Sequence, residues 1–359
     1  MMRLGLVTGF PGLTEVAVAL AGVHAQVMTS AEVAIGLRVP GVTRSDVRSS
    51  DALVRTYGQR GTVHLFAAGD LGRWTALLSS VAAVPAASGL TSEQGDLLIG
   101  AIDSALAVGE QLTMDELDAE VVAQVGDWAG ELCMPAFGGL WPRWRHVLPL
   151  ASMRGVLCFG AGRGRRVTYC RPALTSPGLT PAELVLWSVR TYLHAYGPST
   201  PARFANWLAI DPRRAEAMFE AADLVPVDVE GTAAWDCAAA LSADVVPAEV
   251  VAGVRLLPYF DSYSYRVGVL CPETLYPGRA AVRALRGAYQ TMVVDGVVAG
   301  VWQQQRSGSS KLAVTVEPVA RLRPGQRELV AEQASVLAAI QERTLSSLTF
   351  GTVSSGAHA

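Results

Sequence analysis

The spacing of apolar and polar residues predicts one succession of elements three times, namely three helices followed by two strands joined by a turn. In the first copy, LTEVAVALAG and SAEVAIGL are predicted as helices, with Ser30 as a suitable N-cap of the second. Thr43 and Asp46 approximate a capping box ahead of a third helix. The β-rich runs LVRTYG and TVHLFA meet around Gln59-Arg60-Gly61, which predicts a hairpin.

The second copy begins near Thr91 with the helical segment TSEQGDLLIGAIDSAL. In LTMDELDAEVVAQV, Thr113 and Glu116 form a full capping box. A third helix is predicted in PRWRHVLPLASM, where Pro149 is expected to end or kink it. RGVLCF and RRVTYC then flank a basic, glycine-rich loop at residues 160–165, which predicts a second hairpin.

The third copy begins near Pro181 with PAELVLWSVRTYLHAYG, an amphipathic helix that Gly197 is expected to close. STPARFANWLAI and DPRRAEAMFEAAD are predicted as the two following helices. LVPVDVEG and TAAWDCA complete the third hairpin, with its turn at Glu230-Gly231. Three helices and a hairpin make a winged helix, and this element is most often a DNA-docking module.

From about residue 254 the sequence pattern changes, and strand-like segments replace the repeated order of helices and hairpins. RLLPYFDSYSYRVGVL, YQTMVVDGVVAGVWQQQ and KLAVTVEPVA are strand-like, with a strong hairpin turn at Asp295-Gly296, and RELVAEQASVLAAIQERTL is a final helix. The predicted fold is therefore α+β, with three tandem winged-helix units, a C-terminal β-rich region and a terminal helix. The predicted segments are winged helices at 1–85, 86–178 and 179–250, a β-rich region at 251–346 and a disordered tail at 347–359.

Composition narrows the class of protein. Half of the residues are hydrophobic, yet no uninterrupted run approaches the ~18 apolar residues of a membrane span, and the first residues lack a signal-peptide pattern. We therefore expect a cytoplasmic protein that does not insert into a membrane. The five cysteines are widely scattered and form no CxxC pair, which predicts structural thiols, no disulfide framework, no metal site and no cofactor.

The charge distribution is more informative than the net charge of −3. Residues 132–182 contain no Asp or Glu but seven arginines, and three of these lie in or beside the glycine-rich loop of the second hairpin. Guanidinium groups bind phosphates well, and glycines let the chain approach a DNA backbone closely. The arginines predicted to contact DNA are Arg55, Arg60, Arg145, Arg154, Arg163, Arg165 and Arg166.

Recognised catalytic motifs such as GxSxG, a Walker loop or HExxH are missing from the sequence. His64, His146 and His194 fall within strand or helix patterns and are interpreted as packed histidines. His24 and Gln26 differ, because they place two polar side chains at i and i+2 in a connector between apolar helices. Such groups either join a structural network or serve a ligand, and the residues alone leave both open.

Several stretches in order resemble the bacterial winged-helix DNA glycosylase family that includes the azinomycin-resistance enzyme. The resemblance spans roughly residues 15 to 320. The stretches that carry it are GVHAQVMTSAEVAIGLR, VRTYGQRGTVHLFAAGDL, LTMDEL, RGVLCFGAGRGRRVTYC, YGPSTPARFANWL, RLLPYFDSY and VVDGVVAGVW.

The resemblance implies that the catalytic motif falls on His24 and Gln26, with histidine in place of the first glutamine of the commoner Gln-x-Gln. This His-x-Gln form resembles a variant branch of the family. The implied activity is monofunctional hydrolysis of the N-glycosidic bond of bulky N7-alkylguanine, with unhooking of crosslinks as a further possibility. This activity would give repair of, or self-resistance to, a genotoxic natural product. The implied partner is double-stranded DNA containing an alkylated purine, bound by a monomer without cofactor.

Two alternatives come from other classes of protein. One is a non-catalytic DNA-binding regulator built of winged helices, which should tolerate the loss of His24. The other is a protein-interaction scaffold with no nucleic-acid partner, which the acidic net charge allows. Salt dependence separates a DNA binder from the scaffold, because each phosphate contact adds about −0.9 to the log–log slope of affinity against salt.

Overall fold

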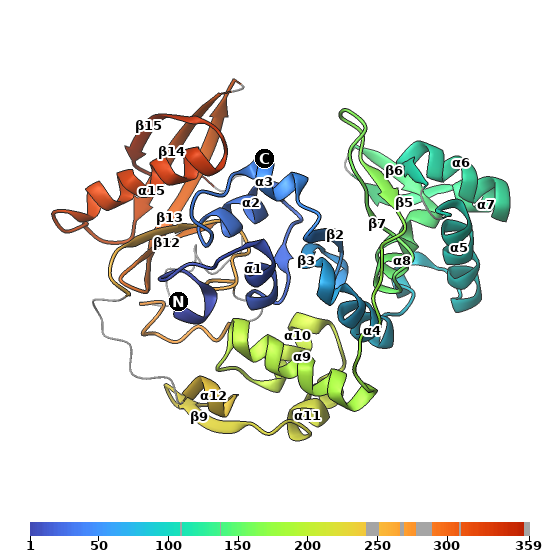
Figure 1. Ribbon diagram of the computed structural model, residues 1–359, viewed down its shortest axis with the longest axis horizontal. Coiled ribbons are helices and arrows are strands. Elements are labelled where there is room, and N and C mark those ends of the chain that lie inside the picture. The colour runs from blue at the N-terminus through green and yellow to red at the C-terminus, as the bar shows by residue number, and fades with distance from the viewer. Residues whose placement is uncertain are drawn as a thin grey trace. The chain divides into compact units, whose positions relative to one another are not determined.

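The computed structural model describes residues 1–107, 110–136, 138–241, 251–265, 269–277, 289–308 and 310–354 (Figure 1). The chain forms two compact units. The first contains residues 1–53 together with the chain from residue 186 onward, and the second contains residues 54–185. Each unit is described below by itself.

The first unit begins with short helices. They are the 3-10 turn η1 (Met2–Leu4), α1 (Leu13–Ala19), α2 (Met28–Gly36) and α3 (Arg44–Ser49), with the two-residue strand β1 (Val23–His24) between α1 and α2. Thr43 caps α3 in a capping box with Asp46, as predicted. Because β1 lies in a short connector, its side chains are placed by the ends of two helices.

A second helical group of this unit comes later in the chain. It consists of α9 (Pro181–Tyr196), α10 (Pro201–Leu208), α11 (Pro212–Glu220), the antiparallel strands β9 (Val225–Val229) and β10 (Thr232–Asp236), and α12 (Ala238–Leu241). The tight turn at Glu230-Gly231 has positive φ at both residues, as the hairpin prediction requires.

The C-terminal β-rich region is a five-stranded sheet. Its strands, in spatial order, are β11 (Val254–Leu257), β12 (Gln290–Val294), β13 (Val297–Ser307), β14 (Lys311–Pro318) and β15 (Thr344–Phe350). The first four are antiparallel neighbours, and β15 is parallel to β14 because α15 (Gln326–Ile340) makes the crossover between them (Figure 1).

Alternate residues of this sheet enter two different cores, as the two-residue period of a strand requires. Met292 and Trp302 join Val330 and Leu337 of α15 and Val33 of α2 on one face. On the other face, Leu257, Val293, Val298 and Val301 pack with Leu6, Tyr276 and Val353. Strands β11 and β12 are therefore covered on both faces, whereas β15 at the edge is largely exposed.

The second unit is mixed as well. Its strands are β2 (Leu53–Tyr57), which starts at the unit boundary and pairs with β3 (Val63–Ala67), then β4 (Gln111–Thr113), β5 (Leu132–Ala136), β6 (Gly139–Pro142), β7 (Cys158–Phe159) and β8 (Thr168–Cys170). Its α-helices are α4 (Leu71–Val81), α5 (Ser92–Ala105), α6 (Met114–Val125), α7 (Asp127–Gly130) and α8 (Leu148–Met153). Leu98, Leu117, Trp144 and Leu157 are fully buried in its core.

Gly72 of α4 tests how tightly the second unit is packed. A Cβ on Gly72 would lie 2.0 Å from the backbone oxygen of Thr175, whereas a Cβ on Gly100 of α5 meets nothing within 4 Å. We expect Gly72→Ala to lower the free energy of unfolding by about 1–3 kcal/mol, since backbone must move. Gly100→Ala should raise it by up to about 1 kcal/mol through helix propensity. Urea unfolding of both variants checks this, and a shift of both in the same direction would contradict it.

One predicted helix start is wrong, and one predicted break is present. Helix α2 begins at Met28 behind an extended Val27, so Ser30 is no N-cap but an interior residue, 4% exposed. Ser30 is the first of the buried residues of α2, and packing outweighs the capping preference there. The helix predicted over PRWRHVLPLASM is divided just before Pro149 into the 3-10 helix η5 (Arg143–Val147) and α8, as expected of this proline, which stands in the first turn of α8 where its missing N–H is tolerated.

The sheet region also departs from the prediction. Among the described residues of the stretch RLLPYFDSYSYRVGVL, residues 255–257 are in a strand, as the end of β11, and the chain then turns twice between Pro258 and Ser264. Residues 266–268 of that stretch lie outside the described part. The predicted disordered tail is wrong for residues 347–350, because they belong to β15 and pair with β14. Residues 355–359 of the tail lie outside the described part.

The predicted order of helices and hairpins is present, and the mixed α+β class is confirmed. The division into three winged helices and a C-terminal region stays a prediction, and the compact units group the chain differently. The first stretch of unit one ends at Leu53, the first residue of β2. The predicted segment 1–85 is therefore divided between the two compact units. Across the described ranges, no helix is long and apolar enough to cross a membrane.

Candidate active site

His24 and Gln26 lie in the extended connector between α1 and α2. Ala21 and Gly22 end α1 with φ of 55° and 86°, which turns the chain sharply into β1. Ala25 is fully buried, while His24 is half-buried and Gln26 is exposed. His24 and Gln26 therefore flank a fully buried residue in one short connector, with His24 at the end of β1.

Two aromatic rings of the first unit contact His24. The ring centroid of Phe260 lies 4.2 Å from that of the imidazole, with an angle of 36° between the planes. Tyr265 meets the imidazole edge-on at 5.9 Å, and the two aromatic rings lie 5.3 Å from each other. Neither Phe260 nor Tyr265 was predicted from the sequence as a site residue.

Both rings belong to a segment that begins where β11 ends. We call residues 258–265 the aromatic turn. Its centre is Asp261, whose two carboxylate oxygens accept hydrogen bonds from the Arg38 guanidinium at 2.8 and 2.9 Å. Both side chains of this ion pair are fully buried. Arg38 also donates to the carbonyl oxygens of Leu4 and Ala34, so its donors are well satisfied.

Further hydrogen bonds hold the aromatic turn on both sides of Asp261. The Ser262 hydroxyl donates to the carbonyl of Leu20, at the end of α1. The Tyr263 hydroxyl donates to the carbonyl of Gly296 at 2.5 Å, and the Ser264 hydroxyl lies 2.9 Å from that of Thr291. The turn is thus attached both to the connector that precedes His24 and to the sheet.

A buried carboxylate lies further along α2. Glu32 is 1% exposed and accepts a short hydrogen bond from Arg48. Burial raises the pKa of Glu32, while the hydrogen bond from Arg48 lowers it. Arg306 donates to Thr29 in the first turn of the same helix at 2.8 Å. This carboxylate was also absent from the predicted site.

The predicted DNA contacts all fall in the second unit, and several are engaged by acidic residues. Arg154 pairs with Asp96 of α5, and Arg163 pairs with Glu116 of α6 while also donating to the Gln111 carbonyl. Hydrogen bonds from Thr113 and Arg163 lower the pKa of Glu116 to about 2. Arg165 and Arg166 are exposed at the tip of the loop between β7 and β8. The acid-free stretch is therefore partly neutralised by the neighbouring helices.

The structure brings two further predicted arginines together around an aromatic cluster. The Arg55 guanidinium lies 4.4 Å from the ring centroid of Phe159. Burial raises the pKa of Tyr57, and both Arg55 and Arg145 act on that hydroxyl to lower it. Arg145 also lies over the ring of Trp141 in β6, at 5.4 Å. Arg60 occupies the turn between β2 and β3 with φ of 59°.

The other histidines in secondary structure have packing partners. His64 is 4% exposed, its Nδ1 lies 2.9 Å from the Thr62 carbonyl, and its ring stacks with that of Phe66. Burial lowers the pKa of His146. Nε2 of His194 lies 3.2 Å from the Arg3 carbonyl. The contacts of His64 agree with its interpretation as a packed residue, whereas His146 is half-buried and His194 is exposed, so the interpretation is wrong for His194.

The cysteines are all free thiols, but they are not all isolated. Cys158 and Cys170 are opposite residues of β7 and β8, with their sulfur atoms 3.5 Å apart. Their separation in sequence hid this pairing, which the hairpin creates. In the described ranges, no cluster of three or more His, Cys, Asp or Glu side chains is placed to hold a metal ion.

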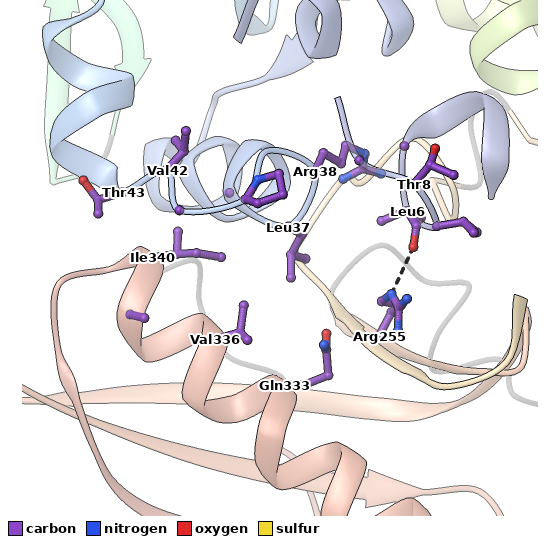
Figure 2. Close-up of a pocket in the computed structure, with 17 residues that line it drawn as sticks. Leu6, Thr8, Leu37, Arg38, Val42, Thr43, Arg255, Gln333, Val336 and Ile340 are labelled. Carbon is purple, nitrogen blue, oxygen red and sulfur yellow. Dashed lines mark hydrogen bonds between the residues drawn. The ribbon is translucent and has the colours of Figure 1, made fainter. Parts of the chain in front are cut away.

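A cavity of about 510 Å³ lies elsewhere in the first unit, between the N-terminal segment, the end of α2 and α15 (Figure 2). Arg255 borders it and donates to the Leu6 carbonyl at 3.1 Å, which Figure 2 marks. Leu37, Val336 and Ile340 give it an apolar wall. Arg38, which pairs with Asp261, also lines it. Neither His24 nor Gln26 is among its lining residues.

Comparison with known proteins decides the family. The family described as DNA glycosylase AlkZ-like matches residues 18–340, which is most of the chain. The chain belongs to the AlkZ-like DNA glycosylase family. This AlkZ-like glycosylase is 32% identical over 317 residues to a curated protein of Streptomyces sahachiroi named interstrand DNA cross-link repair glycosylase. The match covers 82% of each chain.

A solved structure supports the same assignment for the AlkZ-like glycosylase. The structure is the Streptomyces sahachiroi DNA glycosylase AlkZ, with a TM-score of 0.77 and 27% identity. It covers 98% of this chain and 97% of its own. The family resemblance inferred from the sequence is thereby confirmed as membership of a DNA glycosylase family, and the enzyme prediction is confirmed over the regulator and the scaffold.

Proposed function

We propose that this glycosylase hydrolyses the N-glycosidic bond of bulky N7-alkylguanine in double-stranded DNA, with His24 and Gln26 as its catalytic pair. The observation that carries the proposal is their placement in one short connector, on either side of the buried Ala25, with His24 half-buried and Gln26 exposed. The relative from Streptomyces sahachiroi is named for interstrand cross-link repair, and we extend the proposal to unhooking of crosslinks. Repair of, or self-resistance to, a genotoxic natural product would follow.

The chemistry asks little of the protein beyond placing water and stabilising charge. Guanine alkylated at N7 carries a positive charge and leaves as a neutral base, so no strong general acid is needed. The sugar develops oxocarbenium character as the bond breaks. The Gln26 amide can orient the attacking water by hydrogen bonds, and a neutral His24 imidazole can accept its proton.

The test compares adducts of different size in otherwise identical duplexes. We expect release of the free alkylated base from a duplex with a bulky natural-product adduct at N7, faster than from one with N7-methylguanine. The product strand should contain an abasic site and remain uncut until treated with alkali, because the proposal includes no amine nucleophile. Strand cleavage without alkali would contradict the monofunctional mechanism, and preference for the methyl adduct would contradict the specificity for bulky lesions.

We also propose that the loop between β7 and β8 contacts DNA phosphates through Arg165 and Arg166, both exposed. Each phosphate contact contributes about 0.9 to the slope of log affinity against log salt. Replacing both arginines with alanine should therefore reduce that slope by about 2. Fluorescence anisotropy of a labelled duplex across a salt series measures it.

Arg163→Ala is the matched control in the same loop. Its guanidinium already pairs with Glu116 and donates to Gln111, so its loss should change the slope less than the loss of Arg165 and Arg166. A larger change for Arg163→Ala than for the double variant would show that the ion pair with Glu116 opens on DNA, against the proposal. Arg55, Arg60, Arg145 and Arg154 remain proposed contacts on the same unit.

The finer architecture is part of the proposal. We infer that α1–α3 with β2 and β3, the elements from α5 to β8, and α9–α11 with β9 and β10 act as three winged helices on duplex DNA. The His-x-Gln sequence is proposed as a variant of the catalytic motif. We further propose that the enzyme acts as a cytoplasmic monomer, which sedimentation of the free protein and of its DNA complex would test.

A further inference from the structure

Phe260 has a backbone conformation that needs a cause. Its φ is 63°, in the left-handed region that non-glycine residues seldom occupy. A bulky residue persists there only where its surroundings fix it, and such positions cluster at functional sites. The cause here is the next residue, because Asp261 is held by two hydrogen bonds from the fully buried Arg38.

The consequence of this conformation is a contact with His24. The Phe260 ring lies against the imidazole at a centroid distance of 4.2 Å, within the range of favourable aromatic pairs. Tyr265 borders the imidazole at its edge and also packs against Phe260. An imidazole in contact with two rings has little freedom to rotate about its side-chain bonds.

The contact has support on the other side as well. The Ser262 hydroxyl donates to the Leu20 carbonyl, and Leu20 directly precedes the sharp bend that leads to His24. The same hydroxyl lies 3.4 Å from the Tyr196 hydroxyl of α9. The aromatic turn and the connector that carries His24 are therefore fixed to each other by hydrogen bonds as well as by ring contacts.

We infer that Phe260 is a positioning residue for His24, an inference that rests on the proposed function of the His24–Gln26 pair. Its ring offers no proton acceptor, so it acts only through the imidazole, which it holds in one orientation. A general base works when its nitrogen points at the water that it deprotonates, and a misplacement of about 1 Å can lower a rate by about 10²-fold. The Arg38–Asp261 pair is the support that keeps Phe260 in place.

The experiment uses the full chain with three substitutions at this position. Phe260→Leu removes the aromatic ring but keeps an apolar side chain, which must adopt the same positive φ as the phenylalanine. Phe260→Tyr keeps the ring, and Phe260→Gly relieves the backbone and serves if the leucine variant folds poorly. Phe204→Leu is the matched control, because Phe204 is a fully buried phenylalanine of the same unit that packs against Tyr192 and Trp207.

The first readout does not depend on activity. Proton–carbon NMR of histidine-labelled protein reports on each imidazole of the five histidines, and His24→Gln identifies the signal of His24. We expect Phe260→Leu and Phe260→Gly to shift this signal, because the ring current of Phe260 is lost. Phe260→Tyr and Phe204→Leu should leave it in place. An unmoved His24 signal in the leucine and glycine variants overturns the inference.

The second readout is single-turnover base release from the bulky adduct. We expect kcat to fall about 10²-fold in the leucine and glycine variants with little change in KM, and to be retained in Phe260→Tyr and Phe204→Leu. A shifted signal with unchanged kcat overturns the positioning role. If wild type releases no base, the proposed function fails. The contact with His24 is then still judged by NMR, so the two failures are distinguishable.

Discussion

Replacing Arg38 with methionine is expected to lower the free energy of unfolding by about 3–5 kcal/mol, the largest effect on stability that we predict. The methionine leaves the Asp261 carboxylate buried without its two guanidinium donors. A buried charge that loses its partner is far less stable than the original pair, whereas two apolar residues in place of the pair are tolerated. The double variant Arg38→Met/Asp261→Leu should therefore recover much of the loss. Denaturant unfolding followed by circular dichroism measures all three proteins.

An exposed ion pair provides the comparison. Arg73 and Asp70 pair within one turn at the start of α4, with Arg73 40% exposed. Arg73→Met should change the free energy of unfolding by less than about 1 kcal/mol, because exposed pairs are screened by water. Similar losses for Arg38→Met and Arg73→Met, or a double variant weaker than either single variant, would count against the stabilising role of the buried pair.

The second large effect is on the pH dependence of catalysis. If His24 accepts the proton of the attacking water, only its neutral form is active, and acidification lowers the rate. Below the pKa of a general base, the rate of such an enzyme falls roughly tenfold for each pH unit. His24→Gln removes this titration and should lower kcat by about 10²–10⁴-fold near neutral pH. The remaining rate should be nearly flat from pH 5 to about 8.

Tyr265 is the ionisable side chain that the structure places against the His24 ring. Tyr265→Phe is therefore the control, since it keeps the aromatic edge and removes the hydroxyl. It should retain the acid limb of the wild-type profile. An acid limb that survives in His24→Gln would show that another group accepts the proton.

Local sequence patterns predicted the helices and hairpins well where only capping and turn residues determine where an element begins or ends. The capping boxes at Thr43 and Thr113, and the turns at Glu230-Gly231 and Asp295-Gly296, follow from a few neighbouring residues. Ser30 failed as a cap because burial of α2 sets its start. Strand β15 was missed for two reasons. Its burial pattern is weak, and its partner β14 is separated from it in sequence by the whole of α15.

The candidate site shows the same limit. His24 and Gln26 could be singled out because two polar side chains interrupt an apolar stretch. Phe260 and Tyr265 could not, because they lie more than 200 residues away and resemble strand residues in sequence. Only a proline and an aspartate in RLLPYFDSY hinted at a turn. The role of Asp261 depends on its ion pair with Arg38, which follows α2. No local sequence pattern connects these two residues.

The charged surface was predicted in part for a related reason. A stretch without acidic residues indicates a basic surface only if its neighbours in space are not acidic. Asp96, Glu116, Asp103 and Glu131 come from outside the stretch and pair with four of its arginines. The sequence could show the surplus of arginine but not the carboxylates that the fold places beside it.

Release of free base from duplex DNA with a single bulky N7-alkylguanine, by wild type beside His24→Ala and Gln26→Ala, tests the central claim most directly. We predict rapid release by wild type and losses of at least about 10²-fold in both variants, with DNA affinity unchanged. Release that persists in both variants would remove the two residues from catalysis. A wild type that binds DNA in a salt-sensitive way but releases no bulky N7-alkylguanine would contradict the proposed substrate.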